Sequence, residues 1–164
     1  MSLEFTILGC GSSGGIPRAD GNWGACDPNE PKNRRSRCSL LVRRWDGQGV
    51  TSVVVDTSPD FRLQAIAAQL RRLDAVLYTH DHADQAHGID DTRAFFLQDY
   101  RKIPTWMDAA TLDSLSLRFG YVFEAQGGYP AIMEPKLIPP HGAAWSVTGP
   151  GGAIDRKSTR LNSS

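Results

Sequence analysis

Short apolar runs separated by glycine, proline and polar residues dominate the first two thirds of the chain. Runs of this length that are rich in β-branched residues predict strands rather than helices. The expected strands cover residues 5–8, 38–42, 51–55, 75–78 and 103–107. Turn residues from Asp46 to Gly49 predict a hairpin between the second and third strands. The unbroken β-branched run Val53–Val55 is typical of a strand covered on both faces.

Three other segments place apolar residues near a period of 3.6 and therefore predict helices. They cover residues 61–73, 90–99 and 109–118. Ser58, Pro59 and Asp60 supply a cap and a first turn for the first helix. Residues 17–33 show no period and hold several glycines and prolines, so a long loop is expected there. Hairpin strands interspersed with helices predict a layered α/β (α+β) domain.

Composition and charge argue against several classes of protein. The chain has 164 residues, which suffices for one domain, and its 18 basic and 18 acidic residues give a net charge of zero. That balance argues against a general nucleic-acid-binding surface. No apolar run approaches the length of about 18 residues that a membrane span needs, and no secretory leader is visible. The three cysteines show no CxxC spacing, so a cytoplasmic protein without a disulfide framework is expected.

Three of the four histidines lie within eight residues, directly after the apolar run at 75–78. In extended backbone, side chains two residues apart point to the same side, so His80 and His82 can converge on one ion. Asp84 can add a carboxylate from the following turn, and His87 lies within reach of the same cluster. Imidazole and carboxylate ligands suit zinc, and also iron or manganese. The alternative is a set of surface histidines that satisfy loop backbone; the spacing favours a metal site.

The segment Thr79–Asp84, THDHAD, resembles the T-H-x-H-x-D-H metal-ligand motif of metallo-β-lactamase fold hydrolases. Other segments resemble one branch of that superfamily, which includes the phosphoribosyl 1,2-cyclic phosphate phosphodiesterases. These segments are LGCGSSGGIP at 8–17, RRSRCS at 34–39, VVDTSPDFR at 54–62 and GIDD at 88–91. The resemblance covers residues 5 to about 95 and is fairly specific for the fold and the branch, less so for the substrate.

The resemblance implies an αββα sandwich with metals held by loops at one edge. His80 and His82 would bind a first divalent ion and Asp84 a second, so one or two ions are expected, with zinc favoured. Asp84 would also be the catalytic residue that orients the attacking water. Asp56 matches an acidic residue beneath the site in relatives; here a carboxylate that orients a ligand or loop and a plain helix N-terminal acid are both retained.

The sequence departs from the family pattern at three points. Gln85 replaces the last histidine of the motif, and His87 stands two residues later, so either His87 reaches the second metal, or that metal is held weakly, or one metal suffices. Cys26 is the sole cysteine in the long first loop, and one thiolate cannot build a four-ligand structural zinc site. The remaining histidine, His141, follows two prolines and is interpreted as a loop residue rather than a ligand.

The implied function is hydrolysis of a small, cyclic phosphodiester by a metal-bound hydroxide. Sandwich domains of this kind run to about 200–250 residues, so the chain is interpreted as the N-terminal portion of one, inactive by itself. Residues 1–154 would form the truncated domain and 155–164 a non-native or disordered tail. The alternatives are hydrolysis of a thioester, a lactone or a nucleic-acid phosphodiester, or a non-catalytic metal-binding fragment.

Partners are expected to be few. A small phosphorylated substrate is expected, with no membrane and no specific nucleic acid, and a homodimer is left open. The basic residues Lys32, Arg34, Arg35 and Arg37 could contact a phosphate, but a solvated loop is the favoured interpretation. Residues 9–14 also satisfy G-x-G-x-x-G, yet no helical period follows them, so a dinucleotide-binding domain is not expected.

Overall fold

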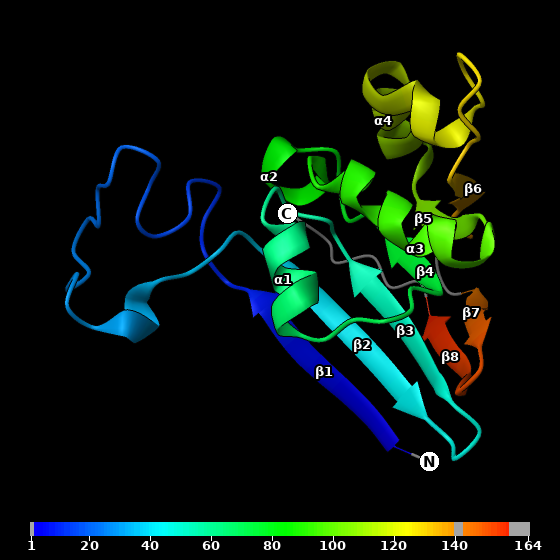
Figure 1. Cartoon of the computed structure of the whole chain (residues 1–164), viewed down its shortest axis with the longest axis horizontal. Coiled ribbons are helices and arrows are strands. Elements are labelled where there is room, and N and C mark those ends of the chain that lie inside the picture. Colours follow the sequence, from blue (N-terminus) through cyan, green and yellow to red (C-terminus); the bar gives the residue numbers. More distant parts are fainter. Residues whose placement is uncertain (1, 140–142, 158–164) are drawn as a thin grey trace.

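A six-stranded mixed sheet forms the centre of the computed structural model, which describes residues 2–139 and 143–157. The strands follow one another in space in chain order (Figure 1). They are β1 (Ser2–Gly9), β2 (Ser39–Trp45), β3 (Val50–Val55), β4 (Ala75–Leu77), β5 (Ile103–Met107) and β6 (Met133–Leu137). The first three strands pair antiparallel, and β3 to β6 pair parallel.

Helical crossovers account for the parallel half of the sheet, since parallel neighbours cannot be joined by a tight turn. Helix α1 (Phe61–Ala67) connects β3 to β4, and α4 (Ala109–Phe123) connects β5 to β6. Three short helices connect β4 to β5: α2 (Ala83–Ala86), the 3-10 helix η2 (Ile89–Thr92) and α3 (Arg93–Asp99). A further 3-10 turn, η1 (Pro31–Asn33), lies in the loop between β1 and β2.

The alternation of side chains along β3 and β4 separates two cores. Val54 and Val76 face the helices and pack in a cluster that includes Phe61 of α1. Val53 and Ala75 face the opposite side and pack in a second cluster. Because successive strand residues point to opposite faces, the valine run is buried on both sides of the sheet, as its composition predicts.

The second core is closed by a two-stranded antiparallel sheet, β7 (Ala144–Gly149) and β8 (Gly152–Lys157). Val147 and Ile154 of this hairpin are buried against the main sheet. Trp145 stacks on Trp106 of β5 with 4.2 Å between ring centroids. Helices, main sheet and second sheet therefore form successive layers, which confirms the predicted α/β class.

Helix α1 is shorter than predicted. It ends at Ala67 instead of Leu73. Gln69 adopts φ +50, the Leu70 amide donates to the Ala65 carbonyl at 2.9 Å, and the Gln69 amide donates to the Ile66 carbonyl at 3.0 Å. This pair of bonds is a Schellman ending, which satisfies the last helix carbonyls and turns the chain away from the helix axis. The helical spacing of apolar residues continues past the end of α1 in the sequence because Leu70 and Leu73 are also buried in the core.

The long loop predicted at residues 17–33 leaves the body as an arm, seen on the left of Figure 1. An antiparallel bridge between Ile16 and Arg35 closes the base of the arm. Within the arm, the Arg34 guanidinium lies over the Trp23 ring at 5.1 Å from its centroid. The arm contains the short turn η1 and no strand among the residues described, so the loop prediction is confirmed.

The C-terminal part of the chain contains more helix and more strands than predicted. Helix α4 continues past residue 118 to Phe123, with non-helical angles at Phe119, and strands β6, β7 and β8 were not predicted. Strand β8 runs through Lys157, beyond the predicted domain end at residue 154; residues 158–164 of the predicted tail lie outside the described residues, as does His141. None of the helices in the described ranges has the length and apolar character needed to span a bilayer.

Candidate metal centre at the ends of β3 and β4

The predicted site residues follow the carboxyl ends of two neighbouring parallel strands. Strand β3 pairs with β4 at Val55 and Leu77, and the Asp56 amide donates to the Leu77 carbonyl at 2.8 Å. Asp56 therefore lies beside the segment that leads into His80. Loops at the carboxyl ends of parallel strands converge on one edge of a sheet, which is where ligand sites form in such folds.

Asp56 is the buried anchor of this edge. Its side chain is buried, and its backbone has φ +61, a left-handed conformation that aspartate tolerates better than most residues. Its carboxylate accepts bonds from the Thr79 amide and from the Thr79 hydroxyl, each at 2.8 Å. Burial raises the pKa of Asp56, and the two bonds from Thr79 offset part of that increase. The structure therefore supports the interpretation of Asp56 as a carboxylate that orients a neighbouring loop.

Thr79 links Asp56 to His80. The Thr79 Oγ1 atom lies 2.9 Å from Nδ1 of His80. A hydroxyl has a single proton, and here it is directed to the Asp56 carboxylate. Nδ1 of His80 must then donate to Thr79 Oγ1, so that the lone pair of the neutral imidazole lies on Nε2. Partners of this kind set the tautomer and orientation of a metal-binding histidine.

His80 and His82 lie side by side, as the spacing predicts. Their ring centroids are 4.5 Å apart and the rings meet edge to face. Strand β4 ends at Leu77, so the two histidines lie in the loop that follows the strand rather than in the strand itself. His82 is the N-cap of α2, and its carbonyl accepts the Gln85 and Ala86 amides at 3.0 Å each. The short helix α2 therefore fixes the backbone that carries the second imidazole.

The other two predicted ligands lie apart from this pair. Asp84 occupies the first turn of α2, and its carboxylate accepts a bond from Gln85 Nε2 at 3.1 Å. His87 is the C-cap of α2, and its ring packs edge to face on Phe119 of α4, with 5.5 Å between centroids. Over residues 2–139 and 143–157, no three His, Cys, Asp or Glu side chains are grouped as a metal ion requires. The two imidazoles are neighbours, but no third ligand stands beside them among the described residues.

The sequence reasoning missed the contacts of Asp81. Its carboxylate accepts bonds from Ser114 Oγ at 2.6 Å and from Arg118 Nη2 at 3.0 Å, both on α4. The same Arg118 nitrogen donates to the Asp81 carbonyl at 2.5 Å. The loop between the two histidines is therefore held to α4. No local signal could reveal this, because the partners lie more than 30 residues away in the chain.

Gly88 brings the end of α2 against the end of β3. A Cβ at this position would lie 2.1 Å from the Ser58 carbonyl oxygen, and the Gly88 amide donates to the Thr57 carbonyl at 2.9 Å. The Thr57 hydroxyl in turn lies 2.6 Å from the buried Tyr78 hydroxyl. Only glycine allows this approach of the two backbones, and the approach determines where α2 and its flanking histidines lie.

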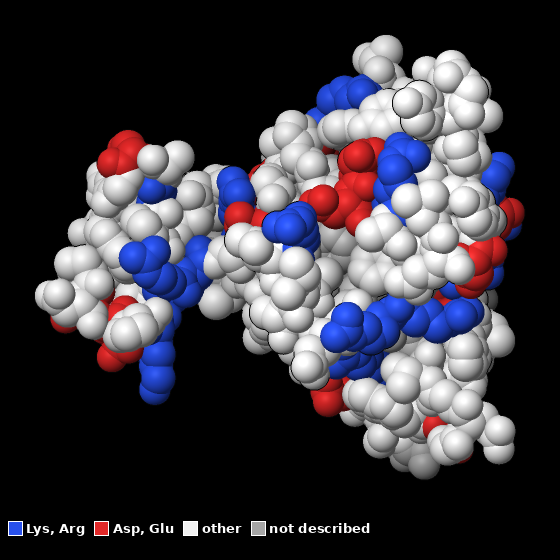
Figure 2. Space-filling model, in the orientation of Figure 1, with Lys and Arg blue, Asp and Glu red and all other residues white. Residues whose placement is uncertain are grey.

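The basic residues at the base of the arm line a common cavity, and each of them also has a partner within the chain. Arg37 binds Asp60 through its backbone amide at 2.9 Å and through Nε and Nη2 at 2.8 and 2.6 Å. Arg34 lies on Trp23, and Arg35 donates to Asn33. Figure 2 shows acidic and basic side chains interspersed over this face, in keeping with the zero net charge. Whether the run is simply a solvated loop or contacts a phosphate stays a prediction.

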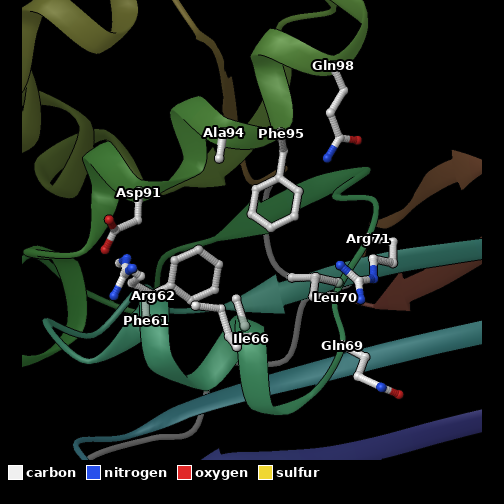
Figure 3. Close-up of a pocket in the computed structure, with 11 residues that line it drawn as sticks. Phe61, Arg62, Ile66, Gln69, Leu70, Arg71, Asp91, Ala94, Phe95 and Gln98 are labelled. Carbon is white, nitrogen blue, oxygen red and sulfur yellow. The ribbon is translucent and has the colours of Figure 1, made fainter.

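A separate cleft of about 350 Å³ lies between α1 and α3. Figure 3 shows Phe61 and Leu70 on the α1 side and Phe95 reaching toward them from α3, with Arg62 and Asp91 at one end and Arg71 at the other. None of the four predicted ligands lines it. The cleft is therefore not part of the candidate metal centre.

Comparison with known proteins gives a family match and several structural neighbours. Residues 51–147 match the family described as the beta-lactamase superfamily domain. A curated relative, an octanoyltransferase of Porphyromonas gingivalis, is 36% identical over 135 residues, which are 82% of this chain and 26% of that protein.

Two solved structures extend the comparison. A new diphosphatase of the PhnP family has a TM-score of 0.71 and 31% identity, covering 90% of this chain and 55% of that one. The zinc-bound PqqB of Methylobacterium extorquens has a TM-score of 0.60 and 18% identity, covering 96% and 60%, and this likeness concerns the fold alone. The chain spans little more than half of these structures and about a quarter of the curated relative.

Proposed function

Because the chain belongs to the β-lactamase superfamily, we propose that it is the metal-binding part of a hydrolase and that the substrate is a small phosphodiester, with cyclic phosphodiesters as the class to assay first. The observation that carries the proposal is the neighbouring imidazole pair of His80 and His82 at the carboxyl end of β4, with 4.5 Å between ring centroids. Paired imidazoles at such an edge are the start of a metal site.

His80 and His82 would hold a divalent ion, with zinc favoured over manganese and iron. Asp84 and His87 are the proposed further ligands, for one or two ions, and Asp84 is the proposed catalytic residue. When bound, such an ion polarises a phosphoryl oxygen and lowers the pKa of a coordinated water. The remaining ligands of the proposed site would come from the part of a full-length protein that this chain does not contain.

The contribution of this chain is to orient the two imidazoles before a metal ion binds. The hydrogen bonds of Asp56 and Thr79 occupy Nδ1 of His80, which leaves the Nε2 lone pair available to an ion. Helix α2 holds the backbone of His82, and Arg118 holds the intervening Asp81. Imidazoles fixed in this way lose less conformational freedom on binding an ion, which increases affinity.

The choice of a phosphoester substrate is supported by the 31% identity to a protein described as a diphosphatase of the PhnP family. A second candidate is an acyl ester or thioester, and the relative named octanoyltransferase favours it. Both classes react through attack on an electrophilic centre bonded to oxygen that an ion can polarise, so the imidazole pair alone does not distinguish them.

The first experiment measures metal bound by the purified chain. We expect His80→Ala and His82→Ala each to lose most of the zinc retained by the wild type, because each removes one of the two neighbouring ligands. His141→Ala, which changes the one histidine outside the 80–87 cluster, is the matched control and should retain zinc. Equal zinc content in all four proteins would refute the metal-binding proposal.

The second experiment concerns the reaction. A full-length protein containing this chain would be assayed with bis-p-nitrophenyl phosphate and with p-nitrophenyl octanoate, each with added zinc or manganese. Faster metal-dependent release from the phosphodiester supports the proposal, whereas release from the octanoate alone supports the second candidate. Retained metal with neither activity would indicate a non-catalytic metal-binding protein.

A further inference from the structure

Cys10 and Cys38 lie on two segments that run side by side where β1 ends and β2 begins. Gly9 pairs with Ser39 as the last pair of the β1–β2 ladder, and Gly11 forms an isolated bridge with Arg37. The first contact is antiparallel and the second is of the parallel type, so the segments turn about each other between them. Cys10 and Cys38 each lie between these two backbone contacts, one on each segment.

The glycines that flank Cys10 show how closely the segments approach. A Cβ at Gly9 would lie 2.1 Å from the Arg37 carbonyl oxygen, and a Cβ at Gly11 would lie 2.7 Å from the Arg35 carbonyl oxygen. A disulfide joins residues whose Cα atoms lie about 4.4–6.8 Å apart, so only segments in close backbone contact, as these two are, can form one.

Both thiols are free and exposed, so a small reagent can reach them. Burial raises the pKa of the Cys38 thiol, and the Asp56 carboxylate and the Cys10 thiol increase it further. Cys26 is also free but lies in the arm, where its amide bonds to the Trp23 carbonyl.

We propose that Cys10 and Cys38 form an oxidation site, in which a small-molecule disulfide such as oxidised glutathione converts their thiols into an intrachain disulfide. One cysteine thiolate attacks a glutathione sulfur, forms a mixed disulfide and releases one glutathione thiolate. The second cysteine thiolate then attacks the protein sulfur of the mixed disulfide and releases the second glutathione. Two protein thiols are oxidised, one glutathione disulfide is reduced to two thiols, and the two protons pass from the cysteines to glutathione.

The disulfide would tie the turn after β1 to the segment that supports the candidate metal centre. Ser39, next to Cys38, donates through its hydroxyl to the Asp56 carbonyl at 2.7 Å. Arg37, on the other side, holds Asp60. Oxidation therefore takes place beside the residues that position the loop of His80. The oxidation itself is independent of the proposed hydrolase activity.

The test uses the native full chain, incubated in buffers of increasing ratio of oxidised to reduced glutathione. The reaction is quenched with acid, the remaining thiols are alkylated under denaturing conditions, and the products are assigned by intact mass and peptide mapping. We expect the oxidised chain to lose two hydrogen atoms in mass and to carry one alkyl group, on Cys26. Cys26→Ser should oxidise in the same way and carry none.

The single variants separate the proposed pair from two independent thiols. Cys10→Ser and Cys38→Ser should each stop at a stable glutathione adduct on the remaining partner, because the resolving thiol is absent. A disulfide that includes Cys26, stable adducts on Cys10 and Cys38 together in the wild type, or no oxidation of the pair at ratios that oxidise a reference dithiol such as thioredoxin would each overturn the proposal.

Discussion

The sharpest prediction concerns the proton that Thr79 shares between Asp56 and His80. In the wild type, the Thr79 hydroxyl donates to Asp56 Oδ2 at 2.8 Å, and His80 Nδ1 faces Thr79 Oγ1 at 2.9 Å. Asp56→Asn replaces that oxygen by an amide group, which can only donate. The Thr79 hydroxyl must then donate to Nδ1, and the proton of the neutral imidazole moves to Nε2. The atom proposed to bind a metal loses its free lone pair.

The change in stability should be small. The side-chain carbonyl of the introduced asparagine retains the bond from the Thr79 amide, and asparagine tolerates the left-handed backbone at φ +61. One bond to a charged acceptor becomes a bond between neutral groups, while a buried charge is removed. We therefore expect Asp56→Asn to lower the free energy of unfolding by about 1 kcal/mol. Zinc affinity should fall by about 10–100-fold, the usual effect of losing a partner that orients a ligand.

Two measurements check this reasoning, and one of them needs no metal. Long-range nitrogen–proton NMR spectra of the metal-free protein should show His80 with its proton on Nδ1 in the wild type and on Nε2 in Asp56→Asn. Zinc affinity is measured by competition with a chromophoric chelator, with Asp60→Asn as the control carboxylate. The reasoning is refuted if the His80 tautomer is the same in both proteins while urea unfolding shows that both are folded.

Two further predictions test how the site is supported. Gly88→Ala should lower the free energy of unfolding by about 2–4 kcal/mol, because its Cβ would lie 2.1 Å from the Ser58 carbonyl oxygen. Thermal unfolding measures the change. The control is Gly120→Ala, whose Cβ meets nothing nearer than 3.7 Å and which should be neutral or stabilising. The side-chain hydrogen bond from Arg37 lowers the pKa of Asp60, so this pair stabilises the fold above the unfolded carboxyl pKa of about 3.9 and loses that contribution as the pH falls through the lower folded pKa. Asp60→Asn should therefore be about 1 kcal/mol less stable than the wild type at pH 7 in urea unfolding, with a smaller difference near pH 3; an equal difference at both pH values would contradict the assignment.

Much of the sheet could be predicted because its strands have an unambiguous local pattern. The strand at Ile103–Met107 has the predicted bounds, and the valine run of β3 is buried on both faces as expected. Strand β6 escaped prediction because it contains Pro135, which lacks an amide donor and is tolerated at the end of the strand order. The end of α1 escaped because Gln69, rather than glycine, adopts the left-handed angle.

The sequence also predicted one part of the candidate site and missed another. The spacing of His80 and His82 predicted neighbouring imidazoles, and the structure confirms that they are neighbours. The spacing also placed His87 within reach of them, yet its ring packs on Phe119, a residue from a helix later in the chain. Whether these residues bind a metal stays a prediction.

The amino-acid pattern alone therefore determined strands β1 to β5, the loop before β2 and the histidine motif at the end of β4, because each depends on neighbours a few residues apart. Tertiary structure decided which polar groups share a proton at Asp56 and Thr79, and that Asp81 is held by α4. It also brought the segments that carry Cys10 and Cys38 side by side. These contacts join segments far apart in the sequence, and the packing of the sheet and its crossover helices brings them together.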